Sequence, residues 1–228
     1  MNYVLLMEAY ARLRQGLVDL GLRLEEGADF SHAVAFAMEM GRTGLTEHFS
    51  PDLNTYTPPG AFWLRAIDAT GATVALAAAR LDDLGPMTLA DYWRLYWRRC
   101  YPGPDGRCEL AAAQPAFSAA VSGRVVYMGE MWVHPDWRGR GVAALFAPAI
   151  QMLSLARWEP DWLYVWMRPG LYGAGFDNLT CAFSRVYLRG IRWAVPPTTV
   201  DDDLCVALNS RADAEYWAEL IAAGLHGK

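Results

Sequence analysis

The feature that most constrains this chain is a strand-like run that leads through a glycine-containing loop into a helix-like run. Arg124–Val133 is rich in β-branched and aromatic residues and predicts a strand. Gly139 and Gly141 follow in a short loop, and Val142–Ala156 has the apolar content of a buried helix. The first N–H groups of a helix lack internal acceptors and carry the positive end of the helix dipole, while glycines let an anion approach closely. The sequence therefore predicts a phosphate or pyrophosphate site at this loop.

Several anion-binding motifs compete for the loop. A Walker P-loop requires Lys followed by Ser or Thr after its last glycine, whereas Val142 and Ala143 stand here. The dinucleotide fingerprint requires three glycines, and only two are present. The stretch from Arg138 to Gly141 also has the Arg-Gly composition of some RNA-binding segments, so this alternative stays open. The net charge of −5, from 20 basic and 25 acidic residues, argues against a broad basic surface for nucleic acid.

The rest of the pattern alternates strands and helices and predicts an α/β (α+β) chain with a mixed sheet flanked by helices. The hairpin Phe62–Asp68 and Thr73–Leu81 turns at Ala69–Ala72, and Phe49–Gly60 is a loop. The other expected strands are Leu22–Glu25, Trp162–Met167, Ile191–Val195 and Leu204–Leu208. The other expected helices are 3–20, 31–42 with Ser31 as N-cap, Leu89–Arg99, Asn178–Arg189 and Ala212–Ala223.

With 228 residues, the chain is expected to form a single domain over 1–228, with an insert at about 82–123 between the third and fourth strands. The composition is 54% hydrophobic and 20% charged, which is typical of a globular protein. The 10 Trp, 11 Tyr and 8 Phe indicate either a packed aromatic core or an aromatic-lined pocket. Trp93 and Trp97 lie in the insert. They are candidates for the wall of a substrate pocket, or for the buried face of a surface helix.

Other functional classes are disfavoured by what the sequence lacks. The four cysteines form no CxxC pair and the four histidines are scattered, so no metal site is expected. A disulfide between Cys100 and Cys108 is the less favoured interpretation of that pair. No apolar run is long enough to span a membrane, and the charged residues near the N-terminus disfavour a signal peptide. A cytoplasmic location is therefore expected.

At this point the sequence resembles a known family. The run from Arg138 to Ala143 fits the R/Q-x-x-G-x-G/A motif of the GCN5-related N-acetyltransferase (GNAT) superfamily. The residues from Glu130 to Pro135 are similar to the end of that family's fourth strand, and Trp162–Met167 to its fifth. The resemblance is clearest over 124–195. It implies the acyl-CoA N-acyltransferase fold, with a mixed, mostly antiparallel central sheet.

The resemblance also implies acetyl-CoA as cosubstrate. In such a fold, the loop amides hold the pyrophosphate and the end of the fourth strand pairs with the pantetheine arm, which enters where the fourth and fifth strands separate. The same backbone can donate to the oxyanion of the tetrahedral intermediate. The residues implied in cofactor binding are Met131, Trp132, Val133, Arg138, Gly139, Arg140, Gly141, Val142, Ala143 and Asn178.

Acetyl transfer to an amine requires proton transfers. Glu130 is the best candidate for the base, directly or through a water, while an ion-pair partner is its structural interpretation. His134 is a second, weaker candidate. The resemblance implies a tyrosine as the acid that protonates the leaving thiolate. Tyr187 is the candidate, although it stands three residues before Gly190 rather than the usual four, and Ile191 replaces the usual aromatic residue.

The resemblance thus implies an N-acetyltransferase that moves an acetyl group to a primary amine by direct attack in a ternary complex. The acceptor is a small molecule or a peptide, and no metal, nucleic acid or membrane partner is expected. A monomer and a homodimer are both compatible with the sequence. One alternative is a non-catalytic acyl-CoA sensor or scaffold, and the other is a nucleotide- or RNA-binding module that uses the Gly/Arg loop.

Overall fold

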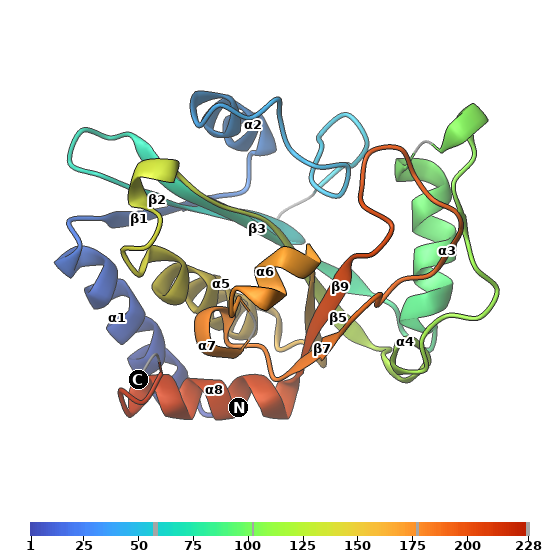
Figure 1. Ribbon diagram of the computed structural model, residues 1–228. Helices are drawn as coiled ribbons and strands as arrows, with labels where there is room; N and C mark the ends of the chain where they lie inside the picture. The colour runs from blue at the N-terminus through green and yellow to red at the C-terminus, as the bar shows by residue number, and fades with distance from the viewer. Residues whose placement is uncertain (57–58, 102, 177, 227–228) are drawn as a thin grey trace.

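A computed structural model describes residues 1–56, 59–101, 103–176 and 178–226, without the side chains of 97–99, 105 and 178–179 (Figure 1). The helices are α1 Tyr3–Asp19, α2 Phe30–Glu39, α3 Leu89–Cys100, α4 Phe117–Ala120, α5 Val142–Trp158, α6 Pro169–Gly173, α7 Asn178–Cys181 and α8 Arg211–Ala222. The strands are β1 Arg23–Gly27, β2 Ala61–Ile67, β3 Thr73–Asp83, β4 Glu109–Leu110, β5 Arg124–Val133, β6 Trp162–Met167, β7 Arg185–Tyr187, β8 Trp193–Val195 and β9 Cys205–Ser210.

The main sheet has seven strands in the order β1-β2-β3-β5-β6-β9-β7. Its neighbouring strands pair antiparallel except β5 and β6, which are parallel. The expected fold class, a mixed and mostly antiparallel sheet flanked by helices, is therefore confirmed. The crossover between the two parallel strands is made by α5, as a parallel connection requires. This crossover carries the glycine-containing loop that the sequence singled out.

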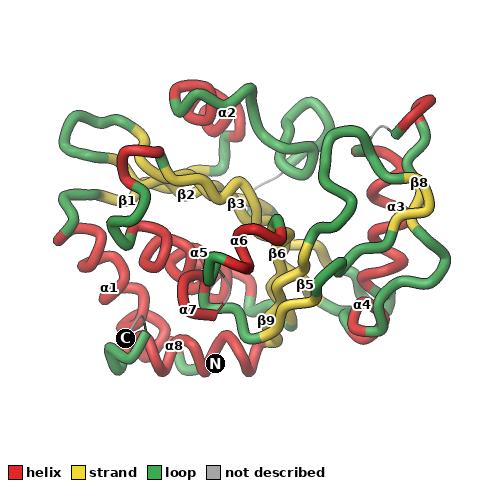
Figure 2. Tube along the Cα trace, in the orientation of Figure 1, coloured by secondary structure: helices red, strands yellow, loops and turns green. Residues whose placement is uncertain are grey.

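Helices cover both faces of the sheet (Figures 1 and 2). On one face, α1, α5 and α8 pack together and bury a core to which β5 contributes Val126 and Met128. On the other face, α2 and α3 cover a second core, to which β5 contributes Val125 and Tyr127. This alternation follows from the two-residue period of a strand. In a regular strand, the even-numbered residues of β5 therefore face α5 and the odd-numbered residues face α2 and α3.

Capping explains where the N-terminal helices begin. Asn2 caps α1 by accepting a hydrogen bond from the backbone N–H of Leu5 at 3.2 Å. The second helix covers Phe30–Glu39 instead of the predicted 31–42, and Asp29 rather than Ser31 is its N-cap. The Asp29 carboxylate accepts from the backbone N–H of Ser31 at 2.9 Å. The prediction of Ser31 as the cap is therefore wrong: an aspartate caps a helix as well as a serine does, and here it lies two residues earlier.

The segment between β3 and β5 covers the residues predicted from the sequence to be an insert, at about 82–123. It contains α3, α4 and the two-residue strand β4, and β4 pairs with β8 in a separate small sheet. The strand predicted at Ile191–Val195 is therefore shorter than expected and belongs to this small sheet rather than to the main one. The paired strands β4 and β8 lie beside α3 (Figure 2).

The helix predicted over Asn178–Arg189 is wrong. Helix α7 ends after four residues, and Ala182 has a positive φ of 56°. The Asn209 side chain of β9 donates to the carbonyl of Ala182 at 2.7 Å, which gives that group a partner outside a helix. The chain then continues as β7, which pairs with the free edge of β9. A tertiary partner therefore overrode a local pattern that fitted a helix.

The cysteines and the helices bear on two further expectations. None of the four cysteines forms a disulfide, so the less favoured bridge between Cys100 and Cys108 is absent. None of the helices in the described part of the chain combines the length and the apolar character that spanning a bilayer requires.

A buried histidine makes stability depend on pH. His48 is 1% exposed and lies against the rings of Tyr96 and Tyr127. Burial, and then the charge of Arg80, lower the pKa of His48 well below its usual value of 6.5. Below pH 6.5, His48 takes up a proton in the unfolded chain but stays neutral in the folded chain until the pH reaches its lowered pKa. The contribution of neutral His48 to stability is therefore fully present above pH 6.5 and is lost as the pH falls.

We expect the free energy of unfolding to fall by up to about 1.4 kcal/mol per pH unit below the pKa of an unfolded histidine. Urea unfolding measured between about pH 7 and pH 5.5 checks this. The variant His48→Phe should lose the part of the slope that one proton accounts for. An unchanged slope in that variant would show that another group is responsible.

Candidate active site

The two parallel strands separate partway along their length. Residues Val125–Met128 of β5 pair with Trp162–Val165 of β6, and the pairing stops there. Beyond that point β5 continues against β3 as far as Val133, and β6 continues against β9 as far as Met167. The edge of β5 that faces β6 therefore carries backbone groups without a strand partner. Such groups are suited to pair with a ligand that contains amides.

A bulge in β5 lies where the strands separate. Leu76 and Ala78 of β3 pair with Trp132 and Gly129 of β5. One residue lies between the two partners on β3, whereas two residues, Glu130 and Met131, lie between them on β5. Glu130 has a φ of 59°, which is strained for a residue with a side chain. In an unbroken strand Glu130 would face α5, with Val126 and Met128. The extra residue turns its carboxylate toward the side of α2 instead.

The carboxylate of Glu130 is enclosed and paired. Its side chain is 0% exposed, and Oε2 accepts a hydrogen bond from Nη2 of Arg42 at 2.5 Å. Oε1 accepts from the backbone N–H of Thr46 at 2.8 Å and also from the Thr46 hydroxyl. The ion-pair interpretation of Glu130 is therefore correct for this conformation. A role as base remains a proposal, because hydrogen bonds in the absence of substrate do not exclude a catalytic group.

Arg42 and Thr46 are the residues of this site that sequence reasoning missed. They lie 88 and 84 positions from Glu130 in the chain, on the segment between α2 and β2. No periodicity or motif connects them to β5. The only local signal is a pair of glycines, Gly41 and Gly44, which both have positive φ and mark an irregular segment.

The loop after β5 leads into an uncapped helix. A 3-10 turn at Pro135–Trp137 is followed by Gly139 and Gly141, with φ values of 74° and 82°, and α5 begins at Val142. Within the part of the chain that the structure describes, no side chain caps α5. Among the described residues, no hydrogen bond is found for the backbone N–H of either glycine or of Arg140 between them. These donors are exposed at the positive end of a 17-residue helix, as an anion site requires.

Two arginines flank the exposed donors. The guanidinium of Arg138 donates from Nε to the carbonyl of Val133 at 3.1 Å and lies 5.7 Å from the ring centre of Trp132. The guanidinium of Arg140 lies 5.0 Å from the ring centre of Trp137. Both arginines are exposed. The loop therefore combines two cations with free N–H groups, although the chain as a whole is acidic.

The structure brings most of the predicted cofactor residues together. Met131 and Val133 pack toward the core under α5, while Trp132 is half-buried on the opposite face. Val142 is buried and Ala143 is half-buried at the start of α5. The side chains of Asn178 and Trp97 lie outside the described residues, so neither prediction can be placed beyond its helix.

Trp93 is buried in the aromatic core. Its side chain is fully buried, and Nε1 donates to the Tyr164 hydroxyl at 3.4 Å. Its ring lies against Tyr164, Trp166 and Phe117. The expectation of a substrate wall at Trp93 is therefore wrong for this conformation. The residue holds α3 against β6, which is the role of a core aromatic.

Tyr187 lies on β7 rather than on a helix. Its ring stacks on Phe117 with centres 4.0 Å apart. β7 is the third strand from β5 in the sheet, about 14 Å away at the usual strand spacing. The general-acid prediction placed Tyr187 on a helix, whereas the structure places it on a strand that is not adjacent to β5. The structure therefore does not bring Tyr187 and Glu130 together.

From this position we expect Tyr187→Phe to change kcat by less than about twofold, because the variant keeps the stacked ring and removes only the hydroxyl. Steady-state kinetics with a saturating acceptor would check this. A loss of about a hundredfold would instead restore Tyr187 as the acid.

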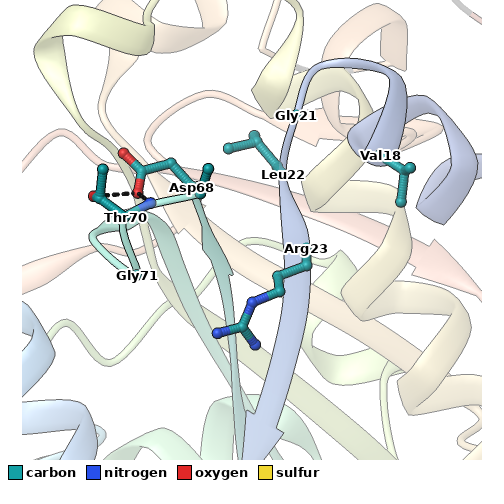
Figure 3. Close-up of a pocket in the computed structure, with 8 residues that line it drawn as sticks. Val18, Gly21, Leu22, Arg23, Asp68, Thr70 and Gly71 are labelled. Atoms are coloured by element: carbon teal, nitrogen blue, oxygen red, sulfur yellow. Dashed lines mark hydrogen bonds between the residues drawn. The ribbon is translucent and has the colours of Figure 1, made fainter.

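One open cavity lies at the same end of the sheet as the loop. It has a volume of about 500 Å³, between the turn after α1 and the β2–β3 turn (Figure 3). Asp68 accepts hydrogen bonds there from the backbone and the hydroxyl of Thr70, and Arg23 pairs with Glu25. None of the predicted site residues whose side chains are described lines this cavity. It contributes nothing to the site at the β5 bulge.

No protein-family model and no curated protein matches the chain. Among solved structures, the chain is similar to FeeM, an N-acyl amino acid synthase from uncultured soil microbes, at 11% identity and a TM-score of 0.49 over 89% of this chain and 97% of that one. It is similar to mutant forms of the spermidine/spermine N-acetyltransferase SpeG from Vibrio cholerae at 9% identity and 0.47, over 87% and 99%. It is also similar to a GNAT-family acetyltransferase from Staphylococcus aureus at 11% and 0.45, over 83% and 99%. Because these identities are at most 11% and these TM-scores are below 0.5, the likenesses carry no argument about the function of this chain.

Proposed function

We propose that this protein is a GNAT-type N-acyltransferase that moves an acetyl group from acetyl-CoA to a primary amine. The observation that carries the proposal is the order in which three structural features follow one another along one stretch of chain. Strand β5 separates from its parallel neighbour, bulges at Glu130, and leads directly to the uncapped N-terminus of α5. A long substrate with amides at one end and a pyrophosphate at the other matches this order.

Each part of acetyl-CoA has residues suited to bind it. The N–H groups of Gly139, Arg140 and Gly141 would hold the pyrophosphate, with Arg138 beside them. The open edge of β5 near Met131 and beyond would pair with the pantetheine amides. The thioester would then lie at the bulge, beside Glu130.

The reaction has a simple proton balance. The acceptor ammonium gives a proton to Glu130, and the neutral amine attacks the thioester carbonyl. A backbone N–H of β5 stabilises the oxyanion that forms. The nitrogen then loses its second proton, the C–S bond breaks, and the leaving thiolate takes up one proton. The sum is one amide, one free thiol and one released proton.

Binding and turnover measurements separate this proposal from its alternatives. We expect acetyl-CoA to raise the melting temperature, and ATP and single-stranded RNA to leave it unchanged. We also expect free thiol to be released only when an amine is added. Stabilisation by acetyl-CoA without transfer to any amine would favour a sensor. Stabilisation by ATP or RNA alone would contradict the proposal.

A further inference from the structure

One donor of the buried ion pair finds no acceptor in the described part of the chain. Arg42 uses Nη2 to bind Glu130, but its Nη1 is buried and has no hydrogen-bond partner among the described residues. A buried guanidinium nitrogen without an acceptor is costly, because its hydration is lost and not replaced. A bound molecule that supplies an acceptor would relieve this cost. The fork of a guanidinium is best matched by a carboxylate.

The carboxylate of the pair also has capacity to spare. A carboxylate offers about four acceptor positions, and Glu130 uses three of them, one for Arg42 and two for Thr46. One position is therefore left for a further donor. The site thus presents a cation with a free donor directly beside an anion with a free acceptor position.

We propose that the acceptor amine is the ammonium group of a free α-amino acid, with its carboxylate bound by Arg42 and its ammonium bound by Glu130. This inference rests on the proposed function. In an α-amino acid the two charged groups are attached to one carbon, so they can reach two protein groups that are themselves in contact. The net charge of the site stays zero when such a zwitterion binds.

A simple amine or a polyamine fits less well. A simple amine satisfies Glu130 and leaves Nη1 of Arg42 without an acceptor. A polyamine brings further positive charge next to the guanidinium, and like charges at short range repel. The pair therefore favours acceptors that carry a carboxylate beside the amine.

Access to the pair requires the covering segment to move. Thr46 is exposed although it binds the enclosed carboxylate, so the cover over Glu130 is thin. Gly41 and Gly44, at φ values of 80° and 144°, lie on either side of Arg42, and a Cβ added to either glycine would meet no atom within 4 Å. This part of the chain follows α2 and crosses above the sheet (Figure 1). The two glycines give the backbone on either side of Arg42 conformational freedom that other residues lack.

Matched pairs of acceptors test the inference. Phenylalanine and phenethylamine, leucine and isopentylamine, and tryptophan and tryptamine differ only in the carboxylate. We expect kcat/KM to be higher by about tenfold or more for each amino acid, the effect of a hydrogen bond between charged groups. The preference should appear mainly in KM. Equal or better use of the decarboxylated amines would overturn the inference and leave the acetyltransferase proposal intact.

Variants identify the residue responsible. Arg42→Lys keeps a charge beside Glu130 but loses the fork, so the preference for the amino acid should shrink with a rise in its KM. Arg94→Lys changes a surface ion pair with Asp91 and should keep the preference. Calorimetric titration of the wild type and the Arg42 variant with phenylalanine gives a readout independent of turnover. Binding that the variant weakens supports the inference even if acetyl-CoA is not the donor, and no binding to the wild type contradicts it.

Discussion

Glu130→Gln should lower kcat by about a hundredfold or more, because general-base catalysis typically contributes 10²–10⁴-fold. The amide keeps an oxygen that can accept from Thr46, but it cannot take up a proton. Acetyl-CoA binding should be unchanged, since the loop that would hold the pyrophosphate is not altered. The measurement is steady-state kinetics with the best acceptor of the matched pairs, together with a calorimetric titration of acetyl-CoA.

The pH profile distinguishes a base from a structural anchor. A base at Glu130 makes kcat fall on the acidic side, and this limb should disappear in the Gln variant. A group that only ties Arg42 and Thr46 to the bulge would lower thermal stability and leave the shape of the profile unchanged. Thr46→Val is the matched control, because it removes one hydroxyl donor to Glu130 and keeps the carboxylate. A Gln variant with full kcat would contradict the assignment of the base.

Gly141→Ala should weaken acetyl-CoA binding by about tenfold or more, which corresponds to about 1.4 kcal/mol. Gly141 precedes the first residue of α5 at a φ of 82°, and its N–H lies among the exposed donors of the loop. A methyl group there would strain the backbone and occupy the space through which a pyrophosphate approaches. Titration calorimetry with acetyl-CoA measures the change.

Gly21→Ala is a close control for this variant. Gly21 has a φ of 80°, also has open space around a Cβ position, and lies in the turn after α1. Both variants should lose similar stability, about 1–2 kcal/mol for a residue with a side chain in this conformation. Only the change at Gly141 should affect acetyl-CoA. Equal binding by both variants and the wild type would remove the loop from the proposed site.

The sequence predicted the core of the fold where local patterns were strong. The bounds of β5 and β6 match the prediction, because their β-branched and aromatic runs are flanked by clear breaks. Helix α5 begins at Val142 as expected, and it continues through Pro148 to Trp158. The motif lies on these elements, which is why the position of the anion loop could be predicted.

The errors arose where distant partners decide the outcome. The end of α7 depends on the Asn209 side chain, and the burial of Trp93 depends on how α3 meets β6. The orientation of Glu130 depends on a bulge and on Arg42, far away in the chain. No local pattern contains this information. The lining of the acceptor site was therefore the least predictable part of the molecule.

A crystal structure of the protein with CoA tests the central claim most directly. We expect the pyrophosphate at the N–H groups of Gly139–Gly141 and the thiol in the gap where β5 and β6 separate, beyond Met128 and Val165. The pantetheine arm should follow the open edge of β5. CoA bound in the cavity of Figure 3, or bound with its thiol away from that gap, would contradict the account.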